Sequence, residues 1–194
     1  MNAMTQLGNG LNITKQYEDA LVVREAVLST MRRLRLSAHS ILAAQTNLAN
    51  TYDQLGRHED VLRIRRDAYT GFSRLYGEEH SLTILAALAL AGCLFSINDF
   101  QETKSLLLRT IPVARQVLEE GDVLTLKLRS LYADALFADP GATLDDTREA
   151  VNTLEDTERT ARRFLGSAHP DTAVIERHLR CAREILHERE SPDT

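Results

Sequence analysis

A helical hairpin is predicted by residues 46–80, which read TNLANTYDQLGRHEDVLRIRRDAYTGFSRLYGEEH. In its first half Leu48, Tyr52 and Leu55 recur every three or four residues, which is the period of one face of an α-helix. Gly56 follows them, at a position where a left-handed backbone can end a helix. The second half carries an apolar stripe of the same period, formed by Val61, Leu62, Ile64, Ala68, Tyr69, Phe72 and Leu75. The stretch therefore predicts two antiparallel helices with a short turn between them.

The same pattern recurs along the chain. A histidine or an aspartate opens a helical stretch at four places, and a small or β-branched residue precedes each of them by 19 positions. The four pairs are Ala20 and His39, Val61 and His80, Thr103 and Asp122, and Ala150 and His169. The steps between successive units are 41, 42 and 47 residues. One offset that holds four times identifies an internal repeat.

These units predict an all-α solenoid of antiparallel helix pairs. We expect about nine helices, near residues 2–14, 17–35, 40–56, 59–76, 80–97, 101–119, 122–138, 146–165 and 169–188. A single domain is expected over residues 1–190, with repeats near 1–37, 38–78, 79–121 and 122–167, a C-terminal helix over 168–190 and a disordered tail over 191–194.

Packing between the helices is expected to follow from residue size. One helix pair cannot bury both of its apolar faces, whereas stacked neighbours can. Small residues let the helices approach closely, namely Ala20, Ala49, Ala68, Ala91, Ala133 and Ala150. Large residues are expected to fill the space between units, namely Tyr52, Phe72, Tyr132 and Phe164.

Two segments depart from the repeat. Residues 2–14 contain Gly8, Asn9 and other poor helix formers, so only a loosely formed helix with frayed ends is expected there. Residues 138–142 carry about five extra positions, with Pro140 and Gly141 as helix breakers. This insertion is expected to be a surface loop. Because closure entropy varies slowly with loop length, deletion of residues 139–143 is expected to change stability little.

Several motifs in these units resemble the tetratricopeptide repeat. They are Leu48-Ala49-Asn50-Thr51-Tyr52 with Gly56-Arg57, the hinge Leu75-Tyr76-Gly77-Glu78-Glu79-His80, and the hinge Phe164-Leu165-Gly166-Ser167-Ala168-His169-Pro170. The usual repeat runs about 34 residues, whereas a step near 42 with a Leu-Gly-x-x-His-Pro hinge resembles the kinesin light chain variety. The resemblance implies a right-handed superhelix that binds other proteins. The third hinge departs from it, with Gly121-Asp122 in place of Gly-x-x-His.

The composition argues against several classes of function. The net charge is −5 and the chain has no Trp, so it offers little of the clustered cationic surface on which nucleic-acid binding depends. Cys93 and Cys181 lie 88 positions apart and show neither a disulfide nor a zinc pattern, which favours a reduced, cytoplasmic setting. No apolar run reaches the roughly 18 residues of a membrane-spanning helix. We expect no nucleic-acid partner, no membrane association and no cofactor.

The histidines favour structural roles. His39, His80 and His169 are expected at helix starts, a whole repeat apart, which is too far for them to share one metal ion. The other three are expected at the surface, namely His58, His178 and His187. Cys93 is expected to be a buried thiol. The sequence shows no set of nucleophile, base and oxyanion donors, so the chain is not predicted to be an enzyme.

The resemblance implies a partner-binding groove on the concave face, lined by the first helix of each pair. Residues at the matching positions are Thr46, Asn47, Asn50, Asp53, Gly92, Phe95, Lys127, Asp134, Phe137, Arg177 and Cys181. The asparagines can hydrogen-bond an extended backbone, the phenylalanines can form apolar pockets, and Lys127 and Arg177 can meet an acidic residue. The alternative is that these residues are solvated surface positions without a role in binding.

Two functions follow as hypotheses. The first is a protein-interaction module that binds a peptide or a partner protein through the concave groove. The alternative is a structural scaffold segment of a larger protein whose activity lies in another domain. The exposed ends of the solenoid also allow self-association, since the first helix is weak and the terminal units lack a strongly polar cap.

Overall fold

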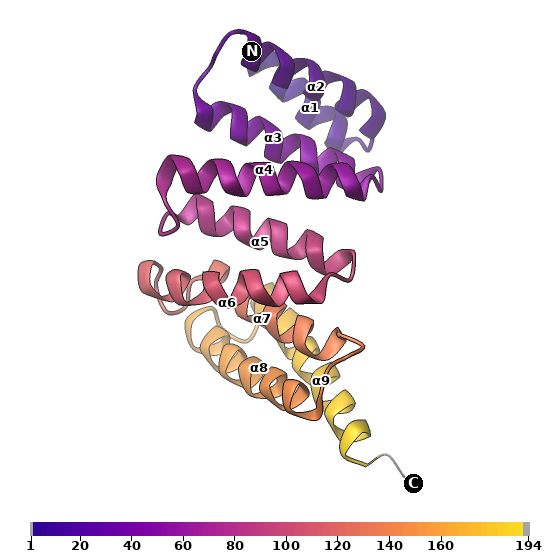
Figure 1. The fold of residues 1–194 in the computed structure, drawn as a ribbon, viewed down its shortest axis with the longest axis vertical. Coiled ribbons are helices and arrows are strands. Elements are labelled where there is room, and N and C mark those ends of the chain that lie inside the picture. Colours follow the sequence, from indigo (N-terminus) through magenta and orange to yellow (C-terminus); the bar gives the residue numbers. More distant parts are fainter. Residues whose placement is uncertain (1, 192–194) are drawn as a thin grey trace. The chain divides into compact units, whose positions relative to one another are not determined.

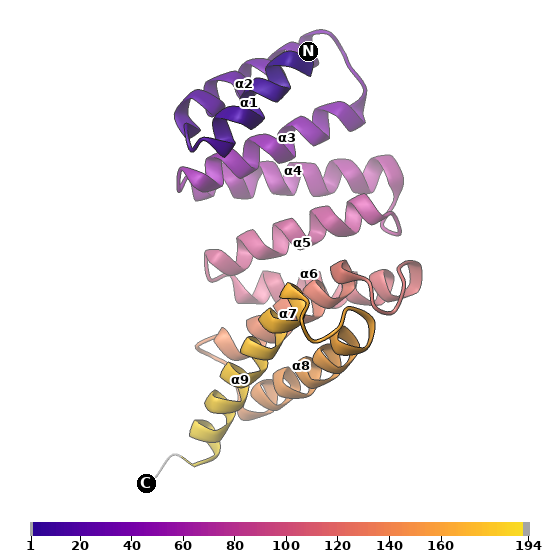
Figure 2. The same cartoon turned by 180° about the vertical axis from the view of Figure 1, so that it is seen from behind.

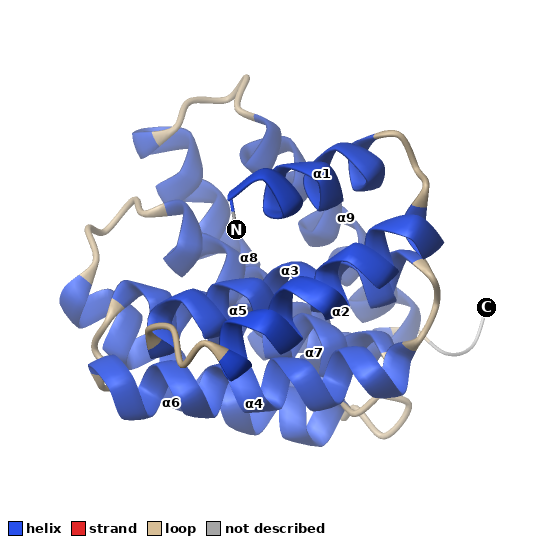
Figure 3. Ribbon diagram, turned by 90° about the horizontal axis from the view of Figure 1, so that it is seen from above, coloured by secondary structure: helices blue, strands red, loops and turns tan. Residues whose placement is uncertain are grey.

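The computed structural model describes residues 2–191, which form nine α-helices and no strand (Figures 1 and 3). The helices are α1 (Asn2–Ile13), α2 (Tyr17–Arg33), α3 (Ala38–Gln54), α4 (His58–Tyr76), α5 (Ser81–Ser96), α6 (Phe100–Val117), α7 (Val123–Ala138), α8 (Leu144–Phe164) and α9 (Pro170–Glu190). Each lies within two residues of its predicted range at either end, which confirms the all-α helical-repeat fold. Residues 192–194 of the predicted tail lie outside the described residues.

Two compact units make up the chain, Met1–Glu78 and Glu79–Thr194. In the first, unit 1, α1 packs on α2, α2 on α3 and α3 on α4. In the second, unit 2, each helix from α5 to α9 packs on the next, and α5 and α9 also contact α7. The odd-numbered helices of unit 2 therefore form one layer, as Figure 2 shows for α7 and α9.

Small side chains let these helices pack closely, as predicted. The six alanines predicted at close helix contacts are all 4% exposed or less. Three of the predicted large fillers are also buried, namely Tyr52, Phe72 and Tyr132. The prediction for Phe164 is wrong, because this residue is 46% exposed at the C-terminal end of α8. Leu75, expected in the apolar stripe of α4, is exposed as well.

Gly121 explains why the third hinge departs from the repeat. A Cβ at this position would overlap the Cβ and Cγ of Phe164, so only glycine lets the α6–α7 connection approach the end of α8. The next residue, Asp122, begins α7 as its N-cap and accepts a hydrogen bond from the backbone N of Leu124 at 2.8 Å. The hinge thus loses its histidine but keeps a capping side chain.

The predicted helix-start role of the hinge histidines is confirmed. Nδ1 of His80 accepts from the backbone N of Leu82 at 3.1 Å, and Nδ1 of His169 accepts from that of Asp171 at 3.2 Å. His39 differs, because Ser37 is the N-cap of α3. Its Nδ1 lies 2.9 Å from Oη of Tyr76, so His39 ties the start of α3 to the end of α4.

Three connections inside helix pairs share one turn. Their middle residues, Lys15, Gly56 and Asn98, have φ angles of 61°, 70° and 61°. In each, the next residue donates its backbone N–H to the carbonyl five positions back at 2.9 Å, which is the Schellman arrangement. Glycine adopts this left-handed conformation freely and asparagine tolerates it, whereas a lysine is strained there.

We expect Lys15→Gly to raise the free energy of unfolding by about 0.5–1 kcal/mol, because it relieves that strain. Urea unfolding followed by circular dichroism measures the change. Asn98→Gly should raise the free energy of unfolding by less than Lys15→Gly does. Gly56→Ala should lower it by about as much as Lys15→Gly raises it. A Lys15→Gly variant less stable than the original would mean that its side chain contributes more than the backbone strain removes.

The predicted first helix is present despite the poor helix formers in its sequence. Residues 2–13 are helical, and the residues that disfavour a helix make contacts with the neighbouring helices. A Cβ at Gly8 would crowd Cγ of Arg24 at 3.2 Å, and Oδ1 of Asn9 accepts from Nη2 of Arg24 at 3.1 Å. Oδ1 of Asn12 accepts from Oγ1 of Thr51 at 3.3 Å. These contacts offset the poor helix propensity of the sequence.

The α7–α8 connection is not a five-residue insertion. Residues 139–143 are the whole connection, whereas the other helix pairs use three residues, and α8 itself has 21 residues against 18 in α6. The segment is also anchored. Oδ2 of Asp139 accepts from Nζ of Lys104 at 2.9 Å, and Thr143 forms a capping box with Asp146 at the start of α8. The premise of a five-residue insertion is therefore wrong, and we expect deletion of residues 139–143 to be costly.

Candidate protein-binding site

Four of the predicted groove residues lie on α3 of unit 1. Thr46, Asn50 and Asp53 are exposed, and Asn47 is half-buried. Oδ2 of Asp53 lies 3.9 Å from Nη2 of Arg65, a long and solvated ion pair. Within residues 2–191 neither the Asn47 nor the Asn50 side-chain amide forms a hydrogen bond, so both are available to a ligand.

Asn47 borders a cavity of about 270 Å³ between α1, α2 and α3. Part of its wall is apolar and comes from α2 and α3, namely Val27, Met31, Ala43 and Ala44. Asn9 and Arg24 add polar groups to the same wall. Mixed walls of this kind are typical of sites that take a side chain and fix its orientation with a few polar contacts.

Arg24 is a buried cation without a counter-charge. Its side chain donates to the backbone O of Asn47 and Oγ1 of Thr51, both at 2.5 Å, and to Asn9. The residue is only 9% exposed, and burial lowers its pKa from the ordinary value. All these acceptors are neutral, and no carboxylate among the described residues forms an ion pair with it. A carboxylate that entered the cavity would be favoured by this charge.

Two of the α7 residues predicted for the groove lie at the junction with α9 in unit 2. Nζ of Lys127 is 3.1 Å from Oδ1 of Asp171, and Oδ2 of Asp134 is 2.9 Å from Nδ1 of His178. Both side chains therefore already have partners inside the fold. The prediction that His178 lies at the surface is wrong in part, because this half-buried side chain links α9 to α7.

Ser130, His178 and Asp134 form a cluster that resembles a catalytic triad only by residue type. Oγ of Ser130 lies 3.1 Å from Nδ1 of His178, the same ring nitrogen that Asp134 contacts. A serine nucleophile needs the ring nitrogen opposite the one that the carboxylate orients. Ser130 is also only 6% exposed, which restricts substrate access. The cluster, as placed, joins two helices and does not form a proton relay.

The remaining groove residues of unit 2 are spread over α5, α7 and α9. Phe95 packs edge-on against Phe100, with ring centroids 5.5 Å apart. Gly92 and Phe137 are half-buried, and Arg177 and Cys181 are exposed. Cys93, in contrast, is buried as predicted.

Arg24 was not among the predicted site residues, although the sequence contains a signal for it. In α2 the buried residues are Ala20, Leu21, Arg24, Val27 and Leu28, so the arginine interrupts the apolar stripe of its own helix. A charged residue at such a position needs polar partners when it is buried. Its partners come from α1 and α3, which only the tertiary structure shows.

The fold is shared with several solved structures. A variant of a putative kinesin light chain of Podosopora anserina with nearly identical TPR-like repeats matches at a TM-score of 0.82 and 21% identity, over 98% of this chain and 88% of that one. BtubC (BKLC) from P. vanneervenii matches at 0.79 and 13% identity, over 97% and 74%. The tetratricopeptide-like fold of kinesin light chain type, inferred from the hinges, is confirmed.

A more distant match is the Rap protein complexed with Competence and Sporulation Factor, with a TM-score of 0.57 and 18% identity over 94% of this chain and 52% of that one. No family model matches the chain, and no curated protein sequence matches it. Across residues 2–191 no helix has both the length and the apolar character needed to cross a bilayer.

Proposed function

We propose that the chain is a protein-interaction module that binds an acidic peptide segment of a partner along α3 of unit 1. The observation that carries this proposal is the buried charge of Arg24, which has only neutral partners and borders the 270 Å³ cavity. A glutamate or aspartate side chain of the partner would supply the missing counter-charge. Charge-assisted hydrogen bonds of this kind are roughly twice as strong as neutral ones.

The asparagines would hold the backbone of the bound segment. An amide carries both a donor and an acceptor, so one asparagine can pair with a peptide N–H and C=O together. Asn47 borders the cavity, and Asn50 lies one helical turn further along α3, which sets two anchor points on one helix face. The Rap complex supports the proposal, because it is a related fold with a partner bound.

The test starts from a peptide array probed with the purified chain, and the strongest acidic binder is then titrated by calorimetry. We expect replacement of both Asn47 and Asn50 by alanine to weaken binding about tenfold or more, since each lost hydrogen bond contributes about 0.5–1.5 kcal/mol. The fold should survive, because neither side chain belongs to the core.

Asn152→Ala is the matched control, because Asn152 is an exposed asparagine on α8 of unit 2. It should leave the affinity unchanged. Changing the acidic residues of the peptide to glutamine should weaken binding as strongly as the double substitution does. Equal affinity for the double variant and the original chain would reject α3 as the binding surface and would favour the scaffold hypothesis.

A further inference from the structure

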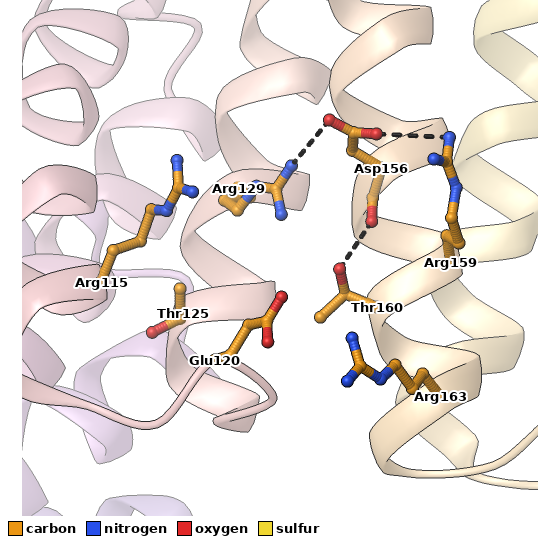
Figure 4. Close-up of a pocket in the computed structure, with 8 residues that line it drawn as sticks. All are labelled: Arg115, Glu120, Thr125, Arg129, Asp156, Arg159, Thr160 and Arg163. Atoms are coloured by element: carbon orange, nitrogen blue, oxygen red, sulfur yellow. Dashed lines mark hydrogen bonds and ion pairs between the residues drawn. The ribbon is translucent and has the colours of Figure 1, made fainter.

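A cavity of about 450 Å³ lies among α6, α7 and α8 of unit 2, and four arginines line it (Figure 4). They are Arg115 of α6, Arg129 of α7, and Arg159 and Arg163 of α8. Two carboxylates, Glu120 and Asp156, share the lining, so two positive charges remain in excess. This local excess contrasts with the net charge of −5 for the whole chain.

The carboxylates leave much of this charge unpaired. Oδ1 of Asp156 lies 3.3 Å from Nη2 of Arg159. Its Oδ2 lies 3.9 Å from Nη2 of Arg129, which is a long ion pair. Arg115 and Arg163 form no ion pair with any residue in the described part of the chain. In Figure 4 Arg115 stands on one side of the cavity and Arg163 on the other, with Arg129 above the space between them.

Arg129 is the most enclosed of the four, with a side chain 17% exposed. Burial, and next the positive charge of Arg115, lower the pKa of Arg129 below its ordinary value. Like charges that face one partly enclosed space repel more strongly than they would in open water. The hydroxyl of Thr125, also in the lining, is buried and has no hydrogen-bond partner among residues 2–191. An anion in the cavity would relieve the repulsion.

We propose that this cavity binds the phosphate of a phosphorylated serine or threonine side chain presented by a partner protein. A phosphate monoester carries about −1.5 to −2 charges at neutral pH, which matches the excess of two positive charges. Its oxygens accept the paired N–H groups of arginine side chains, and several arginines around one phosphate give charge-assisted contacts from different directions.

The size and the lining of the cavity favour a phosphorylated side chain over other phosphates. Its 450 Å³ lies in the range of pockets that hold organic ligands, so an isolated ion would leave most of it empty. The lining contains no aromatic ring on which a nucleobase could stack. Thr125 and Thr160 instead make the remaining wall polar, which suits a peptide backbone. The site shares no residue with the Arg24 cavity, so it is independent of the function proposed for α3.

The probe is N-acetyl-O-phosphoserine N-methylamide, titrated into the isotope-labelled chain by two-dimensional NMR at constant ionic strength. N-acetylglutamate N-methylamide and inorganic phosphate are titrated in parallel. We expect the phosphoserine amide to bind at least tenfold more tightly than the glutamate amide and more tightly than inorganic phosphate. The double variant Arg115→Gln with Arg163→Gln should lose at least tenfold in affinity for it.

Arg109→Gln is the matched control for each single variant, because Arg109 is also exposed on α6 and its loss changes the net charge by the same single unit. It should leave the affinity unchanged, as should the Asn47 and Asn50 substitutions in unit 1, so the two proposals fail or succeed separately. Arg115 and Arg163 are exposed, and thermal melting of each single variant checks that the fold survives. Equal binding of inorganic phosphate, or affinity unchanged in both single variants and the double variant, would overturn the proposal.

Discussion

Replacement of Tyr52 by alanine is expected to lower the free energy of unfolding by about 2–4 kcal/mol. Tyr52 is 5% exposed in the core of unit 1, and its Oη donates to Glu25 of α2 at 2.5 Å. The guanidinium of Arg57 lies 4.5 Å from the centre of its ring. The substitution would therefore empty a buried space between α2 and α3 and remove a cation–π contact. Urea unfolding followed by circular dichroism measures the loss.

Tyr52→Phe is the control that separates the ring from the hydroxyl. It keeps the packing and should lose about 1.5 kcal/mol at pH 8, the lower end of the contribution of a hydrogen bond to a carboxylate. Burial, together with the hydrogen bond to Glu25, raises the pKa of Tyr52 to about 12. Because the unfolded pKa is near 10, this stabilisation is fully present below pH 10 and lost as the pH rises to 12. The advantage of the original chain over Tyr52→Phe should therefore shrink between pH 10 and 12.

A loss below about half a kcal/mol for Tyr52→Ala at pH 8 would show that the site collapses around the smaller side chain or that the tyrosine is exposed in solution. Exposure of the tyrosine would place the register of α3 in doubt. The same register puts Asn47 and Asn50 on the surface, so this measurement also tests a premise of the binding proposal.

The repeat was readable from the sequence because its markers are local. One offset of 19 residues and a helical period of apolar residues were enough to place nine helices. The contacts that hold α1 in place were not readable in this way, since propensity weighs each residue by itself. Gly8 and Asn9 disfavour a helix in isolation, yet both are held by Arg24 of the neighbouring helix. Alignment of the turns would have identified Lys15 as a residue with a left-handed backbone, because it occupies the position of Gly56.

The candidate sites were less predictable because they depend on which helices meet. The periodicity of α3 leaves Asn47 and Asn50 outside its apolar stripe, and the family resemblance implies their place in a groove. The cavity arginines, by contrast, come from three helices and span positions 115–163, so no spacing rule joins them. Asp134 is expected in the open groove from its repeat position, but His178 reaches it from α9. Contacts of this kind require the packing of one helix on another.

Deletion of residues 139–143 is expected to have the largest effect on stability, a loss of more than about 4 kcal/mol or of cooperative folding in unit 2. Helix–helix connections need about two residues or more, and this deletion would join Ala138 directly to Leu144. It would also remove the Thr143 cap, whose loss alone costs about 1 kcal/mol. Nη1 of Arg189 donates to the backbone O of Ala142 at 2.9 Å, so the deletion would free the end of α9 as well.

A shorter deletion shows whether the anchors or the length matter. Removing only Pro140 and Gly141 leaves three residues, the length used by the other helix pairs, and keeps both Asp139 and Thr143. Loop length changes closure entropy slowly, so this variant should lose less than about 1.5 kcal/mol. Thermal and urea unfolding of both variants give the comparison. A five-residue deletion variant with the same free energy of unfolding as the original chain would contradict this prediction. It would mean that α7 or α8 unwinds by a turn to rebuild the connection. It would also mean that the contact of Asp139 with Lys104 does not stabilise the fold.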